Sequence, residues 1–151
     1  MPTQREVLWG VCSGNRIEAG STAGARLARG DSRQGDAPRI AVSRSHTPSW
    51  ILAFASQFGG VFVPSGSVGF KVAMMLLDQA DLYVHKKGLK EWDTCAPETV
   101  ARALGWTVCK LRGEEHRYNQ ADPKNHELVV CRPAMRERVL AALASCGALE
   151  A

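Results

Sequence analysis

Short apolar runs alternate with helix-like apolar spacings along most of the chain. From residue 39 onward, each apolar run is followed by a polar or glycine-rich turn and then by apolar residues three or four positions apart. The predicted strands cover residues 39–43, 61–63, 82–84, 106–111 and 127–131. The predicted helices cover residues 48–58, 70–77 and 93–104, and a last helix opens at Pro133. Strands that alternate with helices predict an α/β layer architecture.

The first 38 residues follow a different pattern. Residues 6–12 are typical of a strand, but residues 20–37 show little apolar periodicity and are rich in glycine, serine and arginine, as a loop or connector would be. No aromatic residue is interleaved with these arginines, which favours a solvated loop over a nucleic-acid contact. We therefore divide the chain into an amino-terminal part, residues 1–38, and an α/β domain, residues 39–151.

Composition and charge narrow the classes of function. The 151 residues are 45% apolar and 23% charged, which is typical of one globular domain. A net charge of +4 is too small to indicate a nucleic-acid or membrane-surface partner, and it hints only at an anionic ligand. The longest strongly apolar stretch, residues 72–77, is far shorter than the roughly 20 residues of a membrane span. The start of the chain lacks the pattern of a signal peptide.

The cysteines indicate a reducing compartment. They are odd in number, widely spaced and include no CxxC pair, so neither a disulfide framework nor a zinc ribbon is expected. The five are Cys12, Cys95, Cys109, Cys131 and Cys146. We therefore expect a cytoplasmic protein.

The turn at residues 66–71 has the clearest chemical meaning. Gly66 and Gly69 would let the backbone turn tightly and approach a ligand, while the following helix start presents free N–H groups. Ser67 and Lys71 are four residues apart, so on a helix they share a face where a hydroxyl and an ammonium suit a phosphate. The P-loop spacing is absent, and a purely structural glycine turn is the alternative.

Two further strand-to-helix junctions carry polar side chains. At the first, Ser43 and His46 follow a predicted strand, and His46 would either donate a hydrogen bond to an anion or cap a helix. At the second, Asp93 follows Trp92 at a helix start. Asp93 is either a plain N-cap or a carboxylate held by a buried indole to bind a divalent metal. Residue chemistry alone leaves both interpretations open.

Four motifs then point to a known family. They are SRSH at residues 43–46, GSVGFK at 66–71, ADLYV at 80–84 and EWDTCAPE at 91–98. Their order and spacing resemble the carboxy-terminal half of the inositol monophosphatase superfamily. WDTCAPE together with SRSH most resembles its 3′(2′),5′-bisphosphate nucleotidase branch. The resemblance implies half of a layered α/β/α/β/α fold, with one mixed sheet flanked by helices.

The resemblance also implies an activity and a set of site residues. The activity is magnesium-dependent conversion of adenosine 3′,5′-bisphosphate to AMP and phosphate, which supports sulfate assimilation. By position, Asp93 would be a metal ligand. The residues expected to hold the nucleotide and its phosphate are Ser43, His46, Ser67 and Lys71, with Gly66 and Gly69 shaping the turn.

The chain departs from the family in its acidic residues. The chemistry of the family needs several carboxylates that converge on magnesium ions. The upstream glutamate and DPxDGT-like segment that supply most of them are absent from this sequence. We therefore predict a truncated, catalytically incomplete chain with no catalytic residue of its own. The expected partner is a complementing amino-terminal half or a second copy, contacted through apolar surface near Leu8, Trp9 and Trp50.

Two alternatives remain open at this stage. One is a non-catalytic remnant that binds a nucleotide or a protein. The other keeps the enzyme class but acts on inositol monophosphate or another sugar phosphate. Outside the site, Arg132, Arg136 and Arg138 are expected on the solvent-facing side of the last helix.

Overall fold

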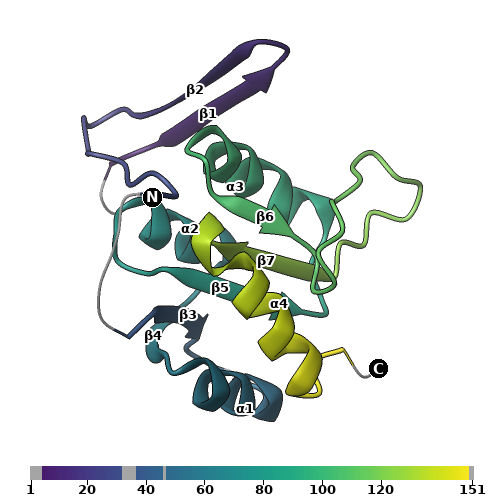
Figure 1. The fold of residues 1–151 in the computed structure, drawn as a ribbon. Coiled ribbons are helices and arrows are strands. Elements are labelled where there is room, and N and C mark those ends of the chain that lie inside the picture. The colour runs from purple at the N-terminus through teal and green to yellow at the C-terminus, as the bar shows by residue number, and fades with distance from the viewer. Residues whose placement is uncertain (1–4, 32–36, 46, 150–151) are drawn as a thin grey trace.

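Strands and helices alternate along the chain from residue 39 to residue 109 (Figure 1). The computed structural model describes residues 5–31, 37–45 and 47–149. The strands are β1 Leu8–Ser13, β2 Arg16–Ser21, β3 Arg39–Ser43, β4 Val61–Ser65, β5 Leu82–Lys86, β6 Thr107–Cys109 and β7 Glu127–Cys131. The helices are α1 Ser49–Phe58, α2 Val68–Leu76, α3 Glu91–Ala103 and α4 Arg136–Ser145, the last preceded by a 3-10 turn at Pro133–Met135.

Five strands form one mixed sheet in the order β4-β3-β5-β7-β6. Strand β3 pairs in parallel with β4 and β5, while β7 runs antiparallel to β5 and β6. Helix α1 connects β3 to β4, and α2 connects β4 to β5. The mixed sheet flanked by helices is thus confirmed. The carboxyl ends of β3, β4 and β5 meet at one edge of the sheet, where open α/β sheets bind ligands.

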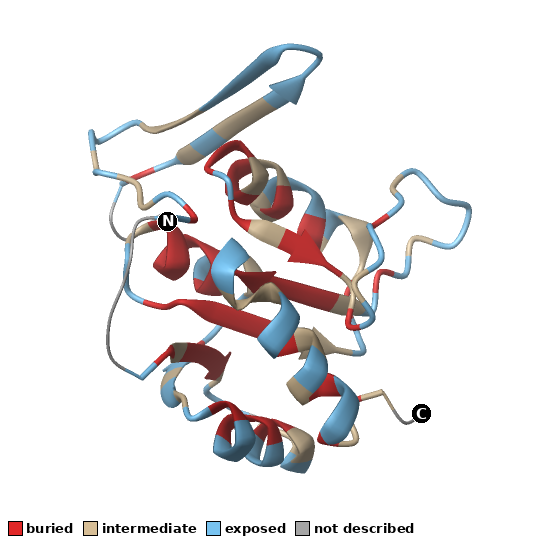
Figure 2. Cartoon of the chain, in the orientation of Figure 1, coloured by how far each residue is buried: buried red, intermediate tan, exposed pale blue. Residues whose placement is uncertain are grey.

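Each face of the sheet has its own apolar core, because successive side chains of a strand point to opposite faces. In β3, Ile40 belongs to the cluster that packs against α1 and α4, whereas its neighbour Ala41 belongs to the cluster that packs against α2 and α3. Leu82 and Tyr83 divide in the same way in β5. The central strands are accordingly buried through most of their length (Figure 2). The layers are helix, sheet and helix.

A separate β-hairpin, β1 and β2, lies beside α3 and is mostly exposed (Figure 2). Its first strand agrees with the prediction for residues 6–12, but β2 is not predicted by the sequence pattern. The backbone of Gly10 packs so closely on α3 that a Cβ there would lie 2.8 Å from Cα of Val100. Glycine at this position therefore allows the hairpin to contact the helix.

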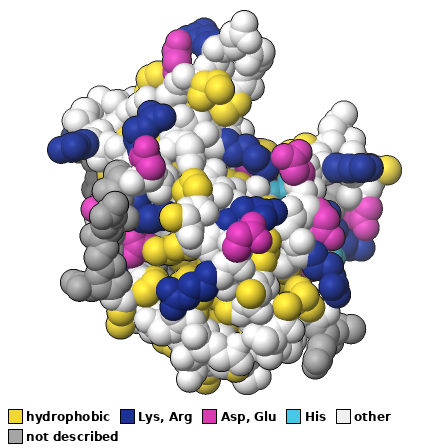
Figure 3. All heavy atoms as spheres, viewed as in Figure 1, with side chains coloured by type: hydrophobic (Ala, Val, Ile, Leu, Met, Phe, Trp, Pro, Cys, Tyr) yellow, Lys and Arg dark blue, Asp and Glu magenta, His cyan; other side chains and the backbone are white. Residues whose placement is uncertain are grey.

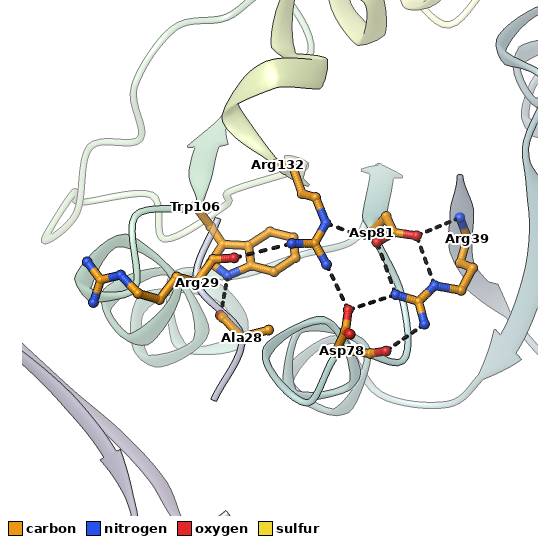
Figure 4. Close-up of polar contacts among 7 residues, drawn as sticks. All are labelled: Ala28, Arg29, Arg39, Asp78, Asp81, Trp106 and Arg132. Carbon is orange, nitrogen blue, oxygen red and sulfur yellow. Dashed lines mark hydrogen bonds and ion pairs between the residues drawn. The ribbon is translucent and has the colours of Figure 1, made fainter. Parts of the chain in front are cut away.

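Four charged side chains meet at the edge of the sheet opposite the carboxyl ends of β3 and β5 (Figure 4). The carboxylate of Asp81 accepts hydrogen bonds from Arg39 and Arg132, and Asp78 accepts from the same two guanidinium groups. Arg132 also lies over the ring of Trp106, with Cζ 4.7 Å from the ring centroid. The expectation that Arg132 faces solvent is wrong, because only 2% of it is exposed.

The same cluster holds the segment that leads from the hairpin to the sheet. Arg132 donates to the carbonyl of Arg29, and the indole N–H of Trp106 donates to the carbonyl of Ala28 (Figure 4). The backbone N–H of Gly30 donates to the carbonyl of Leu104. The described part of the predicted connector is therefore bonded to the α/β domain.

Candidate functional site

The turns predicted at residues 43–46 and 66–71 follow β3 and β4, so they lie next to each other at the carboxyl ends of these two parallel strands. Ser43 is the last residue of β3 and pairs with Ser65, the last residue of β4. The chain then turns, and the N–H of Arg44 donates to the carbonyl of Ser65 while the hydroxyl of Thr47 donates to the carbonyl of Ser43. His46, predicted to contact an anion, lies outside the described residues. Ser43 thus stands at the predicted edge of the sheet.

The turn between β4 and α2 differs from the predicted glycine turn. Gly69 lies within α2, and neither Gly66 nor Gly69 takes a positive φ. Ser67 takes it instead, with φ of 48°, an uncommon angle for a residue with a side chain. The nearest protein atom to a Cβ placed on Gly66 would be the Arg44 guanidinium, 3.8 Å away. Gly66 therefore leaves space beside the turn rather than supplying its bend.

A first hollow of about 660 Å³ opens at the carboxyl ends of β3 and β5. Ser43 and Lys71 both line it. Lys71 is only 4% exposed, and its Nζ lies 3.5 Å from the hydroxyl of Tyr83 and 4.8 Å from the centre of that ring. Burial lowers the pKa of the Lys71 ammonium. No carboxylate among the described residues forms an ion pair with it, so a buried positive charge faces the hollow without a counter-ion.

Tyr83 and His85 also line the first hollow, and the sequence analysis did not single them out. Nδ1 of His85 lies 3.1 Å from the Tyr83 hydroxyl, and its Nε2 lies 2.6 Å from the carbonyl oxygen of Lys87. Burial lowers the pKa of His85, and the nearby charge of Lys71 lowers it further. Burial also raises the pKa of Tyr83, so the phenol keeps its proton. The pattern that identifies them is the strand period of two, since both lie in β5.

A second hollow of about 560 Å³ lies between the hairpin, α2 and α3. It gathers Ser67, Gly69 and Asp93 among mostly apolar side chains. Asp93 is the third residue of α3, and its carboxylate accepts a 2.9 Å hydrogen bond from the backbone N–H of Lys90. Asp93 therefore supports the helix start from within the first turn rather than as the N-cap. The expected buried indole beside it is wrong, because Trp92 is 67% exposed.

The two hollows are electrostatically connected. The negative charge of Asp93, which lines the second, adds to the increase in the pKa of Tyr83, which lines the first. The predicted site residues therefore fall into two neighbouring groups. Ser43 and Lys71 belong to one, and Ser67, Gly69 and Asp93 belong to the other.

The residues expected to form apolar interaction surface lie in different places. Trp9 is 41% exposed on β1, and Leu8 lines the second hollow. Trp50 lines the first hollow and packs against the core beneath α1 and α4. Exposed Phe70 joins Trp92 at the second hollow. The described exposed apolar side chains are therefore spread over the hairpin, α1, β4, α2 and α3, and only Phe70 and Trp92 among them belong to α2 and α3.

The described residues do not complete a magnesium site by themselves. Within residues 5–31, 37–45 and 47–149, no three histidine, cysteine, aspartate or glutamate side chains converge so that they could hold a metal ion. Among the residues that the structure describes, Asp93 is the one carboxylate that lines the second hollow, and one of its oxygens accepts the hydrogen bond at the start of α3. Magnesium takes six oxygen ligands in octahedral geometry, usually one or two carboxylates together with waters and substrate phosphates, so Asp93 would supply one ligand of the set.

Charge on the surface that carries α4 is mixed. Lys and Arg side chains are interspersed with Asp and Glu rather than gathered into one patch (Figure 3). Within the described residues 5–31, 37–45 and 47–149, no helix is both long enough and apolar enough to span a membrane.

Comparison with known proteins identifies the family. A model described as the inositol monophosphatase family matches residues 23–148. The chain belongs to the inositol monophosphatase family. Two curated relatives are similar in sequence to this family member. The Golgi-resident adenosine 3′,5′-bisphosphate 3′-phosphatase of Bos taurus is 34% identical over 114 residues, and the 3′-phosphoadenosine 5′-phosphate phosphatase of Mycobacterium tuberculosis is 35% identical over 106.

Solved structures of family members share the fold. The inositol monophosphatase from Anabaena superposes with a TM-score of 0.71 at 16% identity over 95% of the chain. A calcium-bound family protein from Staphylococcus aureus superposes with a TM-score of 0.64 at 16% identity over 83%. The matches to the bovine and mycobacterial relatives each cover 70% of this chain, but they cover only 30% of the bovine protein and 40% of the mycobacterial protein. The chain spans 56% of the Anabaena and 47% of the Staphylococcus structure.

Proposed function

We propose that this chain carries the anion-binding part of a 3′(2′),5′-bisphosphate nucleotidase. The reaction is hydrolysis of the 3′-phosphate of adenosine 3′,5′-bisphosphate, which gives AMP and inorganic phosphate. The observation that carries this proposal is the Lys71 ammonium, which is 96% buried at the wall of a hollow and has no carboxylate partner among the described residues. An anion in the hollow would supply the missing counter-charge.

The neighbouring groups suit a phosphate ester. Ser43 offers a hydroxyl from the end of β3 in the same hollow as Lys71. Gly66 and Ser67 form the turn into α2, and a Cβ on Gly66 would come within 3.8 Å of the Arg44 guanidinium. Gly69, in the first turn of α2, lines the second hollow together with Ser67, so we propose that it shapes the neighbouring part of the site. His46 completes the proposed set from the same junction as Ser43.

A nucleotide is favoured over inositol monophosphate by the curated relatives. Both relatives named above act, by name, on a 3′-phosphorylated adenosine 5′-phosphate. The chain shares 34% and 35% identity with them in the segments matched. We therefore assign adenosine 3′,5′-bisphosphate as substrate and AMP as a second ligand, and place the activity in sulfate assimilation. A cytoplasmic location fits the five free cysteines.

We propose that Asp93 supplies one ligand to a divalent metal, magnesium, in a site that other carboxylates complete. Because the described residues do not gather enough carboxylates, the remaining ligands come from outside them. A complementing polypeptide or a second copy would supply these ligands at the second hollow. Exposed Phe70 and Trp92 provide apolar contact area there. The 151-residue chain is then catalytically incomplete by itself.

A non-catalytic binding protein is the second candidate. The absence of a metal-ligating cluster among the described residues favours it. Such a protein would bind AMP or a partner chain through the same hollows without turnover.

Release of inorganic phosphate from adenosine 3′,5′-bisphosphate, with magnesium present, tests this account. The purified 151-residue chain is expected to bind AMP but to release no phosphate above the blank. Turnover that appears when a complementing chain is added, and that disappears when the 151-residue chain carries Asp93→Asn, would support the nucleotidase over the binding protein. Robust turnover by the chain alone would overturn its proposed incompleteness.

A further inference from the structure

Lys71, Tyr83 and His85 form a chain of polar contacts along one wall of the first hollow. The Lys71 Nζ lies 3.5 Å from the Tyr83 hydroxyl, which lies 3.1 Å from Nδ1 of His85. Nε2 of His85 lies 2.6 Å from the carbonyl oxygen of Lys87. Lys71 lies on α2, whereas Tyr83 and His85 lie on β5, so these contacts join a helix to a strand.

The chemistry of the two ends fixes the direction of every hydrogen bond. A backbone carbonyl can only accept, so Nε2 of His85 must carry a proton and donate to Lys87. In the neutral imidazole Nδ1 is then an acceptor, and the Tyr83 hydroxyl donates to it. The Tyr83 oxygen consequently presents a lone pair to Lys71, whose ammonium can only donate.

The anchor of the chain is itself held in place. Lys87 takes a positive φ of 80°, and Gly88 follows with φ of 88°. The N–H of Lys87 donates to the carbonyl of His126, and the N–H of Gly88 donates to the ring of His126. These bonds hold the turn after β5, so the Lys87 carbonyl is directed back at His85.

The surroundings keep the chain in this state. Burial, with a smaller contribution from the charge of Lys71, lowers the pKa of His85 although the Lys87 carbonyl and Asp93 act to raise it, and this favours the neutral imidazole that the hydrogen-bond directions require. Burial raises the pKa of Tyr83, so its proton remains available for donation. The ammonium therefore has one neutral acceptor behind it and leaves its other N–H bonds for a ligand.

We propose that Tyr83 and His85 are positioning residues that hold the Lys71 ammonium toward a bound phosphate through hydrogen bonds anchored on the Lys87 carbonyl. The proposal rests on the function proposed for the hollow, because it takes the ligand of Lys71 to be a phosphate group. It adds that side chains of β5, and not α2 alone, set the position of the Lys71 ammonium.

The experiment compares AMP affinity by calorimetry in folded variants, with folding checked by circular dichroism. Tyr83→Phe removes the hydroxyl but keeps the ring, and it is expected to weaken AMP binding about three- to tenfold, the effect of losing one ordinary hydrogen bond. His85→Leu removes the acceptor for Tyr83 and is expected to weaken binding in the same direction. His85→Asn, whose carbonyl oxygen can replace Nδ1, is expected to restore binding to within about twofold of the wild type.

Tyr118→Phe is the matched control. Its hydroxyl donates to Glu98 and lies 3.1 Å from the Thr94 hydroxyl, away from the first hollow, so AMP affinity should stay at the wild-type value. The proposal is overturned if Tyr83→Phe binds AMP like the wild type, or if Tyr118→Phe loses as much affinity as Tyr83→Phe.

A ligand-free measurement separates this proposal from the proposed function. The pKa of Lys71, followed by NMR of its side-chain Cε, is expected to fall further in Tyr83→Phe, because the charged form loses its acceptor. If the wild type fails to bind AMP, the proposed function fails, while this shift still tests the positioning role. An unchanged Lys71 pKa in Tyr83→Phe would refute that role whatever the ligand.

Discussion

The carboxylate of Asp81 accepts a 3.0 Å hydrogen bond from Nε of Arg132, and neither residue is more than 2% exposed. The pair forms because β5 and β7 run antiparallel with Leu82 opposite Cys131, which places the flanking Asp81 and Arg132 side by side. Arg39 adds three further hydrogen bonds to the same carboxylate, one from its backbone N–H and two from its guanidinium. Three strands of the sheet are therefore joined at one buried charge (Figure 4).

Removing the charge of Asp81 should strongly destabilise the fold. Asp81→Asn leaves Arg132 paired with exposed Asp78 but removes its buried counter-ion, and breaking a buried ion pair typically costs about 3–5 kcal/mol. Urea unfolding followed by circular dichroism measures the change. Asp122→Asn is the control, because Asp122 pairs with Lys124 in solvent and should change little. Equal losses in the two variants would contradict the role assigned to Asp81.

The same carboxylate predicts an acid-dependent loss of stability. Burial alone would raise the pKa of Asp81, but hydrogen bonds from Arg39 and Arg132 outweigh it and lower the pKa to about 2. An unfolded aspartate titrates near pH 3.9, so this contribution is complete above about pH 4 and is lost as the pH falls toward 2. Free energies of unfolding measured from pH 5 to pH 2 should therefore fall more steeply for the wild type than for Asp81→Asn. Parallel profiles would refute the assignment.

The buried charge of Lys71 should lower the free energy of unfolding. Its pKa is lowered by burial, so the unfolded chain binds a proton there more tightly than the folded chain, and stability should rise with pH as the lysine loses its charge. Lys71→Met removes the buried charge and is expected to stabilise the protein at pH 7 by about 1–2 kcal/mol. Urea unfolding checks this, with exposed Lys124→Met as the control. A less stable Lys71→Met protein would contradict the view that the buried ammonium has no counter-ion in the ligand-free fold.

Gly10 should be required for contact between the hairpin and α3. A Cβ at this position would lie 2.8 Å from the backbone of Val100, so Gly10→Ala must displace the hairpin or strain the helix. We expect a loss of about 1–3 kcal/mol and a change in the fluorescence of Trp9 on the same strand. Glu18→Ala, at an exposed position of the hairpin, should leave both properties unchanged. Tolerance of alanine at residue 10 would mean that the hairpin is not fixed against α3.

The sequence predicts the strands that can be recognised from their own apolar residues, without knowledge of their partners in the sheet. Strands 39–43 and 127–131 have the bounds predicted for them, because nearly every residue between their turns is apolar. Strand β2 was missed, since its residues are largely exposed and its identity depends on pairing with β1. Strand β5 was ended too early at Val84, because His85 and Lys86 look like loop residues until their pairing with β7 is known.

The candidate site shows the same division. Ser43 and Lys71 come together at the predicted sheet edge, because that position follows from the order of strands and helices. Their neighbour His85 was missed with the end of its strand. The burial of Arg132 depends on Asp81, which lies 51 residues away in the chain, so no local pattern indicates it.

Calorimetric titration of the 151-residue chain with AMP, without divalent metal, tests most directly whether the first hollow is an anion site built on Lys71. The account predicts binding at one site, reduced at least tenfold by Lys71→Met and unaffected by Lys124→Met. Absence of binding by the wild type, or equal affinity in Lys71→Met, would contradict it.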